Sequence, residues 1–264
     1  MDALLLAARM LERGEPCALC TVVRASGSVP RHAGARMLVS ETGTVLAGTI
    51  GGGEMENRTA RAAAAVLHEG QARLESFALV NPGQGDPGVC GGSMEVFIEP
   101  LGAAPILLII GAGHVGRALA YLGKWAGFRV VVADDRSDLC NEQQCPGADL
   151  YLSGDYGAQL DESLLTPRTY AALVTRSYVQ DVRVLPTLLA AKLPYVGVMG
   201  SRRRWLSATQ ELEAAGVSAE SIAAVHAPIG LELEAETPEE IAISILAQVV
   251  AQRRGGDGHA MNAF

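Results

Sequence analysis

The 264-residue sequence predicts an α/β protein, in which an N-terminal α+β domain (residues 1–100) precedes a Rossmann-like doubly wound parallel-sheet domain (residues 105–264). Three observations support this fold class. The first 100 residues contain several short strand-like segments and few helices. The later residues alternate apolar runs with helical segments, which is typical of a parallel sheet covered on both faces. Between them, EPLGAAP (Glu99 to Pro105) has the proline, glycine and alanine content of a linker.

In the N-terminal domain we expect one helix from Ala3 to about Arg13 and a second from Glu54 to about His68. The segments around them are short, rich in apolar residues and bounded by glycine or polar residues, as strands are. They are ALCTVVR, ARMLVS, TVLAGTI, RLESFALV and SMEVFIE.

In the C-terminal domain the predicted strands are ILLII, FRVVVADD, ADLYLSG, YAALVT and YVGVMG. Helices are expected after the first strand, from about Val179 to Lys192, and from Arg202 to Ala215. The last helix, TPEEIAISILAQVVAQRR, has a clear start. Thr237 fits the N-cap, Pro238 the first helical position, and Glu240 the acid of a capping box.

Composition limits the function classes. The hydrophobic content of 49% is ample for a core, and the formal net charge of −8 disfavours nucleic-acid or anionic-membrane partners. The first residues, MDALLLAARMLERGE, are too short and too charged for a signal peptide or a membrane span. We therefore expect a cytoplasmic protein with no nucleic-acid and no membrane partner.

The five cysteines predict reduced thiols rather than a disulfide framework. Cys17 and Cys20 have C-x-x-C spacing but lie in a predicted strand, where residues i and i+3 face opposite sides. Cys140 and Cys145 fall in a polar loop and are expected to be free thiols.

The segment GAGHVG is a G-x-G-x-x-G motif between a strand and a helix. Gly111 would permit the tight turn, Gly113 the close approach of a pyrophosphate, and Gly116 the packing of helix on strand. Asp134 ends the next strand, near the position of a ribose-binding acid, and Arg136 would suit NADP. The alternative is a Rossmann-like turn that binds no ligand.

A second turn, GSRRRW, offers Ser201 as an N-cap and Arg202 to Arg204 in the first helical turn. Cations there oppose the helix dipole, so contact with a phosphate is predicted, with an exposed basic patch as the alternative. His114 in the glycine loop favours a packing or phosphate-side role over that of a general acid. The sequence contains no Walker A lysine, G-x-S-x-G or H-E-x-x-H motif, and it predicts no catalytic residue.

These segments together resemble the XdhC/CoxI family, accessory proteins that mature molybdenum hydroxylases such as xanthine dehydrogenase. The resemblance covers nearly the whole chain and is carried by GSVPRHAGARMLV, GTIGGGEMEN, CGGSMEVFIEP, IIGAGHVGRALA, VADDR, YVGVMGSRRR and HAPIGLELEAETPEEIAISILAQVV. One departure is Tyr178 in TRSYVQD, where the family often has His. Because tyrosine titrates near 10, it is a poor proton donor at this position.

The resemblance implies a chaperone that binds the molybdenum cofactor (molybdopterin), protects it while its sulfido ligand is installed, and inserts it into an apo molybdenum hydroxylase. A cysteine desulfurase is a further implied partner, and we expect a homo-oligomer without turnover of its own. The alternative is an NAD(P)-dependent oxidoreductase that uses Asp134.

In the N-terminal domain, Gly51, Gly52 and Gly53 would let the flat pterin lie close to bare backbone. Glu56, with Glu54 as second choice, would accept from the two adjacent N–H groups of the pterin edge. The alternative is a turn followed by acids that complement the helix dipole. Cys90 would ligate molybdenum or hand on sulfur, or else be an inert thiol.

The implied cofactor-binding residues also include Gly111, Gly113, His114, Gly116, Asp134, Ser201 and Arg202. Arg31 and Arg36 would meet the phosphate, and Cys90 is the one implied metal ligand.

Overall fold

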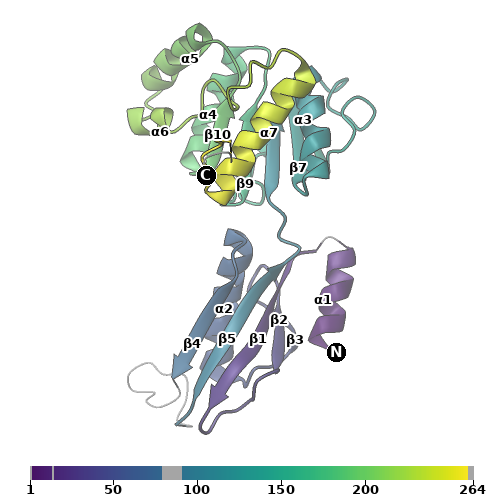
Figure 1. Ribbon diagram of the computed structural model, residues 1–264, viewed down its shortest axis with the longest axis vertical. Helices are drawn as coiled ribbons and strands as arrows, with labels where there is room; N and C mark the ends of the chain where they lie inside the picture. The colour runs from purple at the N-terminus through teal and green to yellow at the C-terminus, as the bar shows by residue number, and fades with distance from the viewer. Residues whose placement is uncertain (1, 14, 79–90, 261–264) are drawn as a thin grey trace. The chain divides into compact units, whose positions relative to one another are not determined.

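The structure, a computed structural model, describes residues 2–13, 15–78 and 91–260 (Figure 1). The chain divides into two compact units, Met1–Ala103 and Ala104–Phe264. Each unit has its own sheet and its own core, and each is described by itself.

The N-terminal unit is an antiparallel sheet with two helices. Its strands are β1 (Cys17–Ser26), β2 (Arg36–Val39), β3 (Val45–Gly48), β4 (Arg73–Ala78) and β5 (Ser93–Leu101), in the order β3-β2-β1-β5-β4. All four neighbouring pairs are antiparallel. The helices are α1 (Ala3–Glu12) and α2 (Gly53–Glu69). The predicted α+β class is confirmed for this unit.

The two helices pack on opposite faces of this sheet, as the alternation of side chains along β1 requires. Ala18, Cys20 and Val22 lie in the core with α2, whereas Cys17 and Leu19 lie in the smaller core with α1. Cys17 and Cys20 therefore face opposite sides of the sheet, as expected, and burial raises the pKa of the Cys20 thiol to about 12.

The C-terminal unit contains a wholly parallel sheet. Its strands are β6 (Ile106–Ile110), β7 (Arg129–Asp134), β8 (Leu150–Ser153), β9 (Thr169–Leu173) and β10 (Tyr195–Val198), in the order β10-β9-β6-β7-β8. From β6 the chain adds β7 and β8 on one side and then β9 and β10 on the other. This order creates a switch point between β6 and β9, where ligands bind in folds of this type.

Helices cover both faces of the parallel sheet. They are α3 (His114–Trp125), α4 (Tyr178–Ala190), α5 (Arg202–Ala214), α6 (Ala219–Ala223) and α7 (Pro238–Arg254), with a 3-10 helix η2 (Tyr156–Gln159). Along β6, Ile106, Leu108 and Ile110 enter the core shared with α4, while Leu107 and Ile109 enter the core shared with α3 and α7. Burial on both faces explains why this strand is an uninterrupted apolar run. The predicted doubly wound Rossmann-like domain is confirmed.

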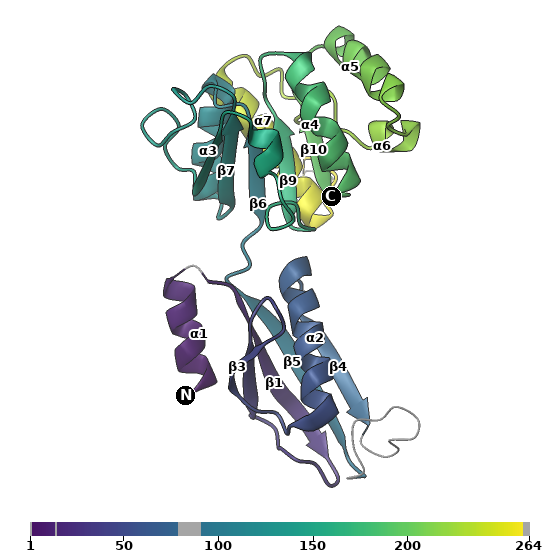
Figure 2. The ribbon, with the colours of Figure 1, turned by 180° about the vertical axis from the view of Figure 1, so that it is seen from behind.

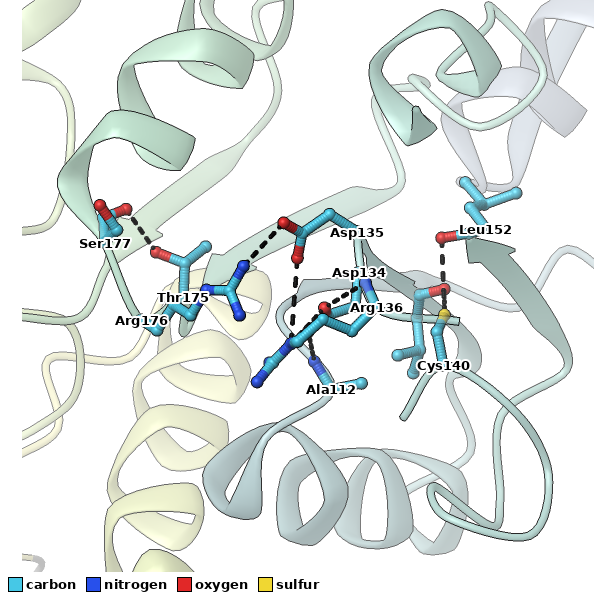
Figure 3. Close-up of polar contacts among 10 residues, drawn as sticks. Ala112, Asp134, Asp135, Arg136, Cys140, Leu152, Thr175, Arg176 and Ser177 are labelled. Carbon is cyan, nitrogen blue, oxygen red and sulfur yellow. Dashed lines mark hydrogen bonds and ion pairs between the residues drawn. The ribbon is translucent and has the colours of Figure 1, made fainter. Parts of the chain in front are cut away.

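The thiols in the loop between β7 and β8 are free but buried. Cys140 donates to the carbonyl oxygens of Val132 and Leu152 (Figure 3). Burial raises the pKa of Cys145 to about 11. Neither thiol has the low pKa of a reactive cysteine.

The start of α7 has the predicted geometry. The Thr237 hydroxyl accepts from the Glu240 amide at 3.2 Å, and the Glu240 carboxylate accepts from the Thr237 amide at 3.0 Å. In the described part of the chain, no helix is both long and apolar enough to cross a membrane.

Thr237→Ala removes the hydroxyl of this capping box. We expect the free energy of unfolding to fall by about 1 kcal/mol, measured by urea denaturation. Thr237→Ser keeps the hydroxyl and is the control, expected to remain within a few tenths of a kcal/mol of the wild type. An equal loss in both variants would contradict a stabilising role for the cap.

Candidate functional site

The glycine triplet of the N-terminal unit forms a turn closed by one carboxylate. Gly51, Gly52 and Gly53 have φ angles of +138°, +80° and +66° and lead from β3 into α2. One oxygen of Glu56, Oε1, accepts from the amides of Ile50, Gly51 and Gly52 at 3.0, 3.1 and 2.7 Å, and from the Thr49 hydroxyl. These bonds hold the turn in one conformation.

The same bonds set the charge of Glu56. Burial acts to raise its pKa, but the bonds from Thr49 and the three amides outweigh burial and lower the pKa below its ordinary value. The carboxylate is therefore ionised at neutral pH. Since Oε1 accepts all four bonds, only Oε2 is available to a ligand.

The three glycines differ in how closely other atoms surround them. A Cβ on Gly51 would lie 2.5 Å from Cγ of Pro30 and 3.0 Å from Cε of Met55, so packing alone requires glycine there. A Cβ on Gly52 or Gly53 would meet nothing within 4 Å. Their positive φ angles favour glycine, and their backbone faces open space. Gly52 is the N-cap of α2 and has no side chain with which to cap the helix.

Helix α2, which follows the turn, lies over β1 and β5 (Figure 2). One further segment meets the turn itself, and a second meets that segment. Pro30 packs on Gly51. A Cβ on Gly92 would collide with the carbonyl oxygen of Ser28, and one on Gly27 would lie 3.0 Å from Cα of Gly92. The structure thus brings together three segments that are far apart in sequence, 27–30, 51–55 and 91–92.

Several candidate residues flank these segments. Arg31 and Arg36 are exposed, and the Arg36 carbonyl oxygen accepts from the Thr49 amide at 2.9 Å. Glu54 pairs with Arg61 at 2.7 Å on the exposed side of α2. Cys90, the residue before Gly91, lies outside the described residues.

In the C-terminal unit the three motif glycines differ in surroundings. A Cβ on Gly111 (φ +117°) would lie 2.7 Å from the carbonyl oxygen of Val174, and one on Gly116 would collide with the carbonyl oxygen of Gly111. Both are required by close packing. Gly113 has φ −72°, which any residue adopts, and a Cβ there would meet nothing within 4 Å. The protein itself gives no reason for glycine at this position.

The acid at the end of β7 is saturated with internal bonds. Asp134 is 4% exposed and accepts from the Ala112 amide at 2.7 Å and the Arg136 amide at 2.9 Å. The Arg136 guanidinium adds bonds of 2.9 and 2.8 Å (Figure 3). Burial opposes ionisation, but these bonds hold the pKa of Asp134 well below its usual range. Four donors fill the acceptor capacity of a carboxylate.

A charged bridge crosses the carboxyl end of β6. Arg176, after β9, donates to Asp135, after β7, at 2.9 Å, and these two strands flank β6 in the sheet (Figure 3). Both side chains are partly exposed, so the pair contributes little to stability. It lies at the switch point, beside the glycine loop.

The three arginines in the first turn of α5 differ in burial. Arg204 donates to the buried Asp181 at 2.5 Å and to the carbonyl oxygen of Thr175 at 3.1 Å, which ties α5 to α4 and to the loop after β9. Arg202 and Arg203 are exposed, and Ser201 caps the helix by accepting the Arg204 amide at 3.2 Å. The sequence did not predict the Asp181–Arg204 pair, because three adjacent arginines give no sign of which is buried.

The remaining candidates lie at helix starts. His114 is exposed at the first position of α3 and lines a groove of about 520 Å³ with Arg117 and Glu239. Tyr178 begins α4, and its hydroxyl bonds to Glu211, which raises its pKa. Within residues 2–13, 15–78 and 91–260, no three His, Cys, Asp or Glu side chains gather closely enough to hold a metal ion.

Comparison with known families gives two matches. The XdhC Rossmann domain matches residues 107–249, and the XdhC and CoxI family matches residues 10–78. Together they cover the parallel-sheet core and much of the N-terminal unit.

Three curated relatives align with the chain. The Escherichia coli (strain K12) protein YqeB, described as uncharacterized, is 35% identical over 97% of this chain and 47% of its own length. A protein of Bacillus subtilis (strain 168), described as a probable xanthine dehydrogenase subunit, is 32% identical over 61% of this chain and 46% of its own length. The molybdenum cofactor insertion chaperone PaoD of Escherichia coli (strain K12) is 25% identical over 94% of this chain and 86% of its own length. The chain spans about half the length of the first two.

A crystal structure described as a xanthine dehydrogenase from Bacillus halodurans has the same fold. It is 22% identical and aligns with 100% of this chain and 98% of its own, with a TM-score of 0.53.

Glu56→Gln tests the carboxylate that closes the glycine turn. We expect the free energy of unfolding of the N-terminal unit to fall by roughly 1–3 kcal/mol, because the acceptor loses its charge and four charge-assisted bonds become weaker neutral bonds. Hydrogen exchange of the Ile50, Gly51 and Gly52 amides should accelerate. Glu54→Gln is the matched control in the same helical turn, and loss of its exposed pair with Arg61 should cost no more than about 0.5 kcal/mol.

The difference in free energy of unfolding between wild type and Glu56→Gln should also depend on pH. A folded-state pKa below the ordinary 4.5 gives stability that is complete above 4.5 and is lost as pH falls through the folded value. The two proteins should therefore converge in stability in acid. A difference that is constant from neutral pH into acid would show that the charge of Glu56 is irrelevant.

Proposed function

Because the chain belongs to the XdhC and CoxI family, we propose that it binds the molybdenum cofactor and inserts it into an apo molybdenum hydroxylase of the xanthine dehydrogenase type. The name of its relative PaoD supports this proposal. The cofactor is cargo, and the chain has no turnover of its own. The transfer takes place in the cytoplasm, with a cysteine desulfurase as the source of the sulfido ligand.

One observation carries the proposal, the bare backbone at Gly52 and Gly53. Two consecutive glycines face open space while Glu56 fixes the turn that presents them. A flat pterin requires close approach without side chains, and a preformed surface avoids the entropy cost of ordering a loop on binding. The first amides of α2 have no intrahelical acceptor and suit the oxygen atoms of the cargo.

Other residues of the N-terminal unit complete the cargo site in this proposal. Oε2 of Glu56 accepts from the amino-pyrimidinone edge of the pterin. Arg31 and Arg36 meet the phosphate tail. Cys90 supplies a soft thiolate to molybdenum.

In the C-terminal unit, Gly113, His114, Ser201 and Arg202 are the proposed anion contacts. Gly113 is the glycine that packing does not require, and it precedes the start of α3. Gly111, Gly116 and Asp134 act by shaping the loop, since Asp134 accepts the Ala112 amide. This loop is suited to a phosphate-bearing ligand.

The alternative, an NAD(P)-dependent oxidoreductase, is favoured by the glycine motif but opposed by Asp134. A ribose hydroxyl needs a free carboxylate oxygen, and both oxygens of Asp134 are already engaged by Arg136 and Ala112. Binding of the ribose would have to break a buried ion pair.

Gly53→Ala tests the cargo site. Equilibrium dialysis against cofactor released from a molybdoenzyme, quantified as its fluorescent oxidised pterin, should show affinity reduced about tenfold or more, because the methyl group occupies the approach to the backbone. Gly127→Ala is the control: Gly127 also has positive φ (+82°) and open space, so it carries a similar strain of about 1 kcal/mol.

Equal affinities in Gly53→Ala and wild type would remove the triplet from the cargo site. Turnover of a substrate with NAD(P), without retention of the pterin, would favour the oxidoreductase instead.

A further inference from the structure

Helices α3 and α7 lie side by side on one face of the C-terminal unit (Figure 1). Both expose large apolar side chains. Tyr121 and Trp125 of α3 are 66% and 82% exposed, and Ile243 and Val250 of α7 are 51% and 39% exposed. We call these four residues the α3/α7 patch. Contiguous exposed apolar surface, unlike single exposed apolar residues, marks interaction sites.

The patch is contiguous because the two helices run in the same direction. Glu239 and His114, near the two helix starts, line one groove, and Trp125 and Val250, near the two ends, line a second. Leu122 and Ile243 line both grooves, so the apolar surface continues from one to the other.

Charge is ordered along the exposed side of α7. At spacings of three or four residues, its outward positions are Glu239, Ile243, Ala247, Val250 and Arg254. This stripe is acidic at its start, apolar in the middle and basic at its end. The helix dipole accounts for the two charged ends but not for the apolar middle. Among the described residues, neither Glu239 nor Arg254 forms an ion pair.

We propose that the α3/α7 patch binds a second copy of this chain, with α7 packed antiparallel against α7 of the partner. A twofold interface places the same surface on both sides, so the surface must complement itself. Reversing α7 sets Glu239 opposite the partner's Arg254, and it sets Ile243 opposite the partner's Val250. Both pairs are centred on the same point of the helix, between Leu246 and Ala247. One register therefore satisfies the charges and the apolar contacts together.

The centre and the flanks also suit this arrangement. Ala247, at the crossing point, has a small side chain that lets two helices approach closely. Tyr121 and Trp125 stand beside α7 and would cover the partner helix, and aromatic residues of this kind are enriched at interfaces. A surface that binds a client enzyme need not be complementary to itself. The self-complementarity of this surface therefore favours a second copy of the chain.

Sedimentation velocity of the full chain over a range of concentrations tests the proposal. Wild type should be a dimer, and Ile243→Glu should raise the dimer dissociation constant about 100-fold or more. Leu206→Glu, at a 63% exposed apolar position on α5, is the matched control and should leave the dimer unchanged.

A charge exchange tests the antiparallel register. Arg254→Glu places a second carboxylate opposite Glu239 and should weaken the dimer about tenfold, as should Glu239→Arg. The double variant, Glu239→Arg with Arg254→Glu, restores opposite charges across the twofold axis. Its dimer dissociation constant should return to within about threefold of the wild-type value. Circular dichroism melting confirms that each variant is folded.

A monomeric wild type, or a dimer that Ile243→Glu leaves intact, would overturn the proposal. A double variant at least as weak as the single variants would overturn the antiparallel register on which it rests.

Discussion

One oxygen atom of Glu56 accepts three backbone amides and a hydroxyl, and the glycine turn before α2 depends on these bonds. Three successive glycines have little conformational preference of their own, so without other support this turn would sample many backbone conformations. The Glu56 carboxylate restricts the turn to a single backbone conformation. Pro30 then packs on Gly51, and Gly52 and Gly53 remain open.

The C-terminal unit uses the same device at a different loop. Asp134 accepts the amide of Ala112, inside the glycine motif, and Arg136 holds the carboxylate in place. In both units an acid that sequence patterns associate with a ligand is bonded to the backbone of a glycine-rich loop that starts a helix. In each loop the acid fixes the backbone conformation. The glycines that face open space are Gly52, Gly53 and Gly113. A preformed loop at a helix start avoids the entropy cost of ordering on binding, and its free amides suit an anion.

Much of the fold follows from the sequence because it depends on local periodicity. The buried strand β6, the start of α7 at Thr237 and the opposite directions of Cys17 and Cys20 all follow from spacing rules. The short helix α6 was not predicted, since five residues carry too little pattern.

The partners of the acids could not be predicted, because they depend on backbone angles that bring amides from different residues to one point. Nothing in the sequence distinguishes Arg204 from Arg202. Burial beside Asp181 separates them, and that contact joins α5 to α4, two helices with β10 between them in the chain. Of the three motif glycines, Gly113 alone is free of crowding, and the motif had already set it apart as the position of close approach.

Hydrogen exchange of the full chain with and without added molybdenum cofactor is the most direct measurement of the central claim. The account predicts that the cofactor protects the amides of residues 53–55, at the open start of α2, while the amides bound to Glu56 are already slow without it. Bound cofactor that leaves the exchange of residues 49–56 unchanged would contradict the account, because the glycine turn would then not be the surface that carries the cargo.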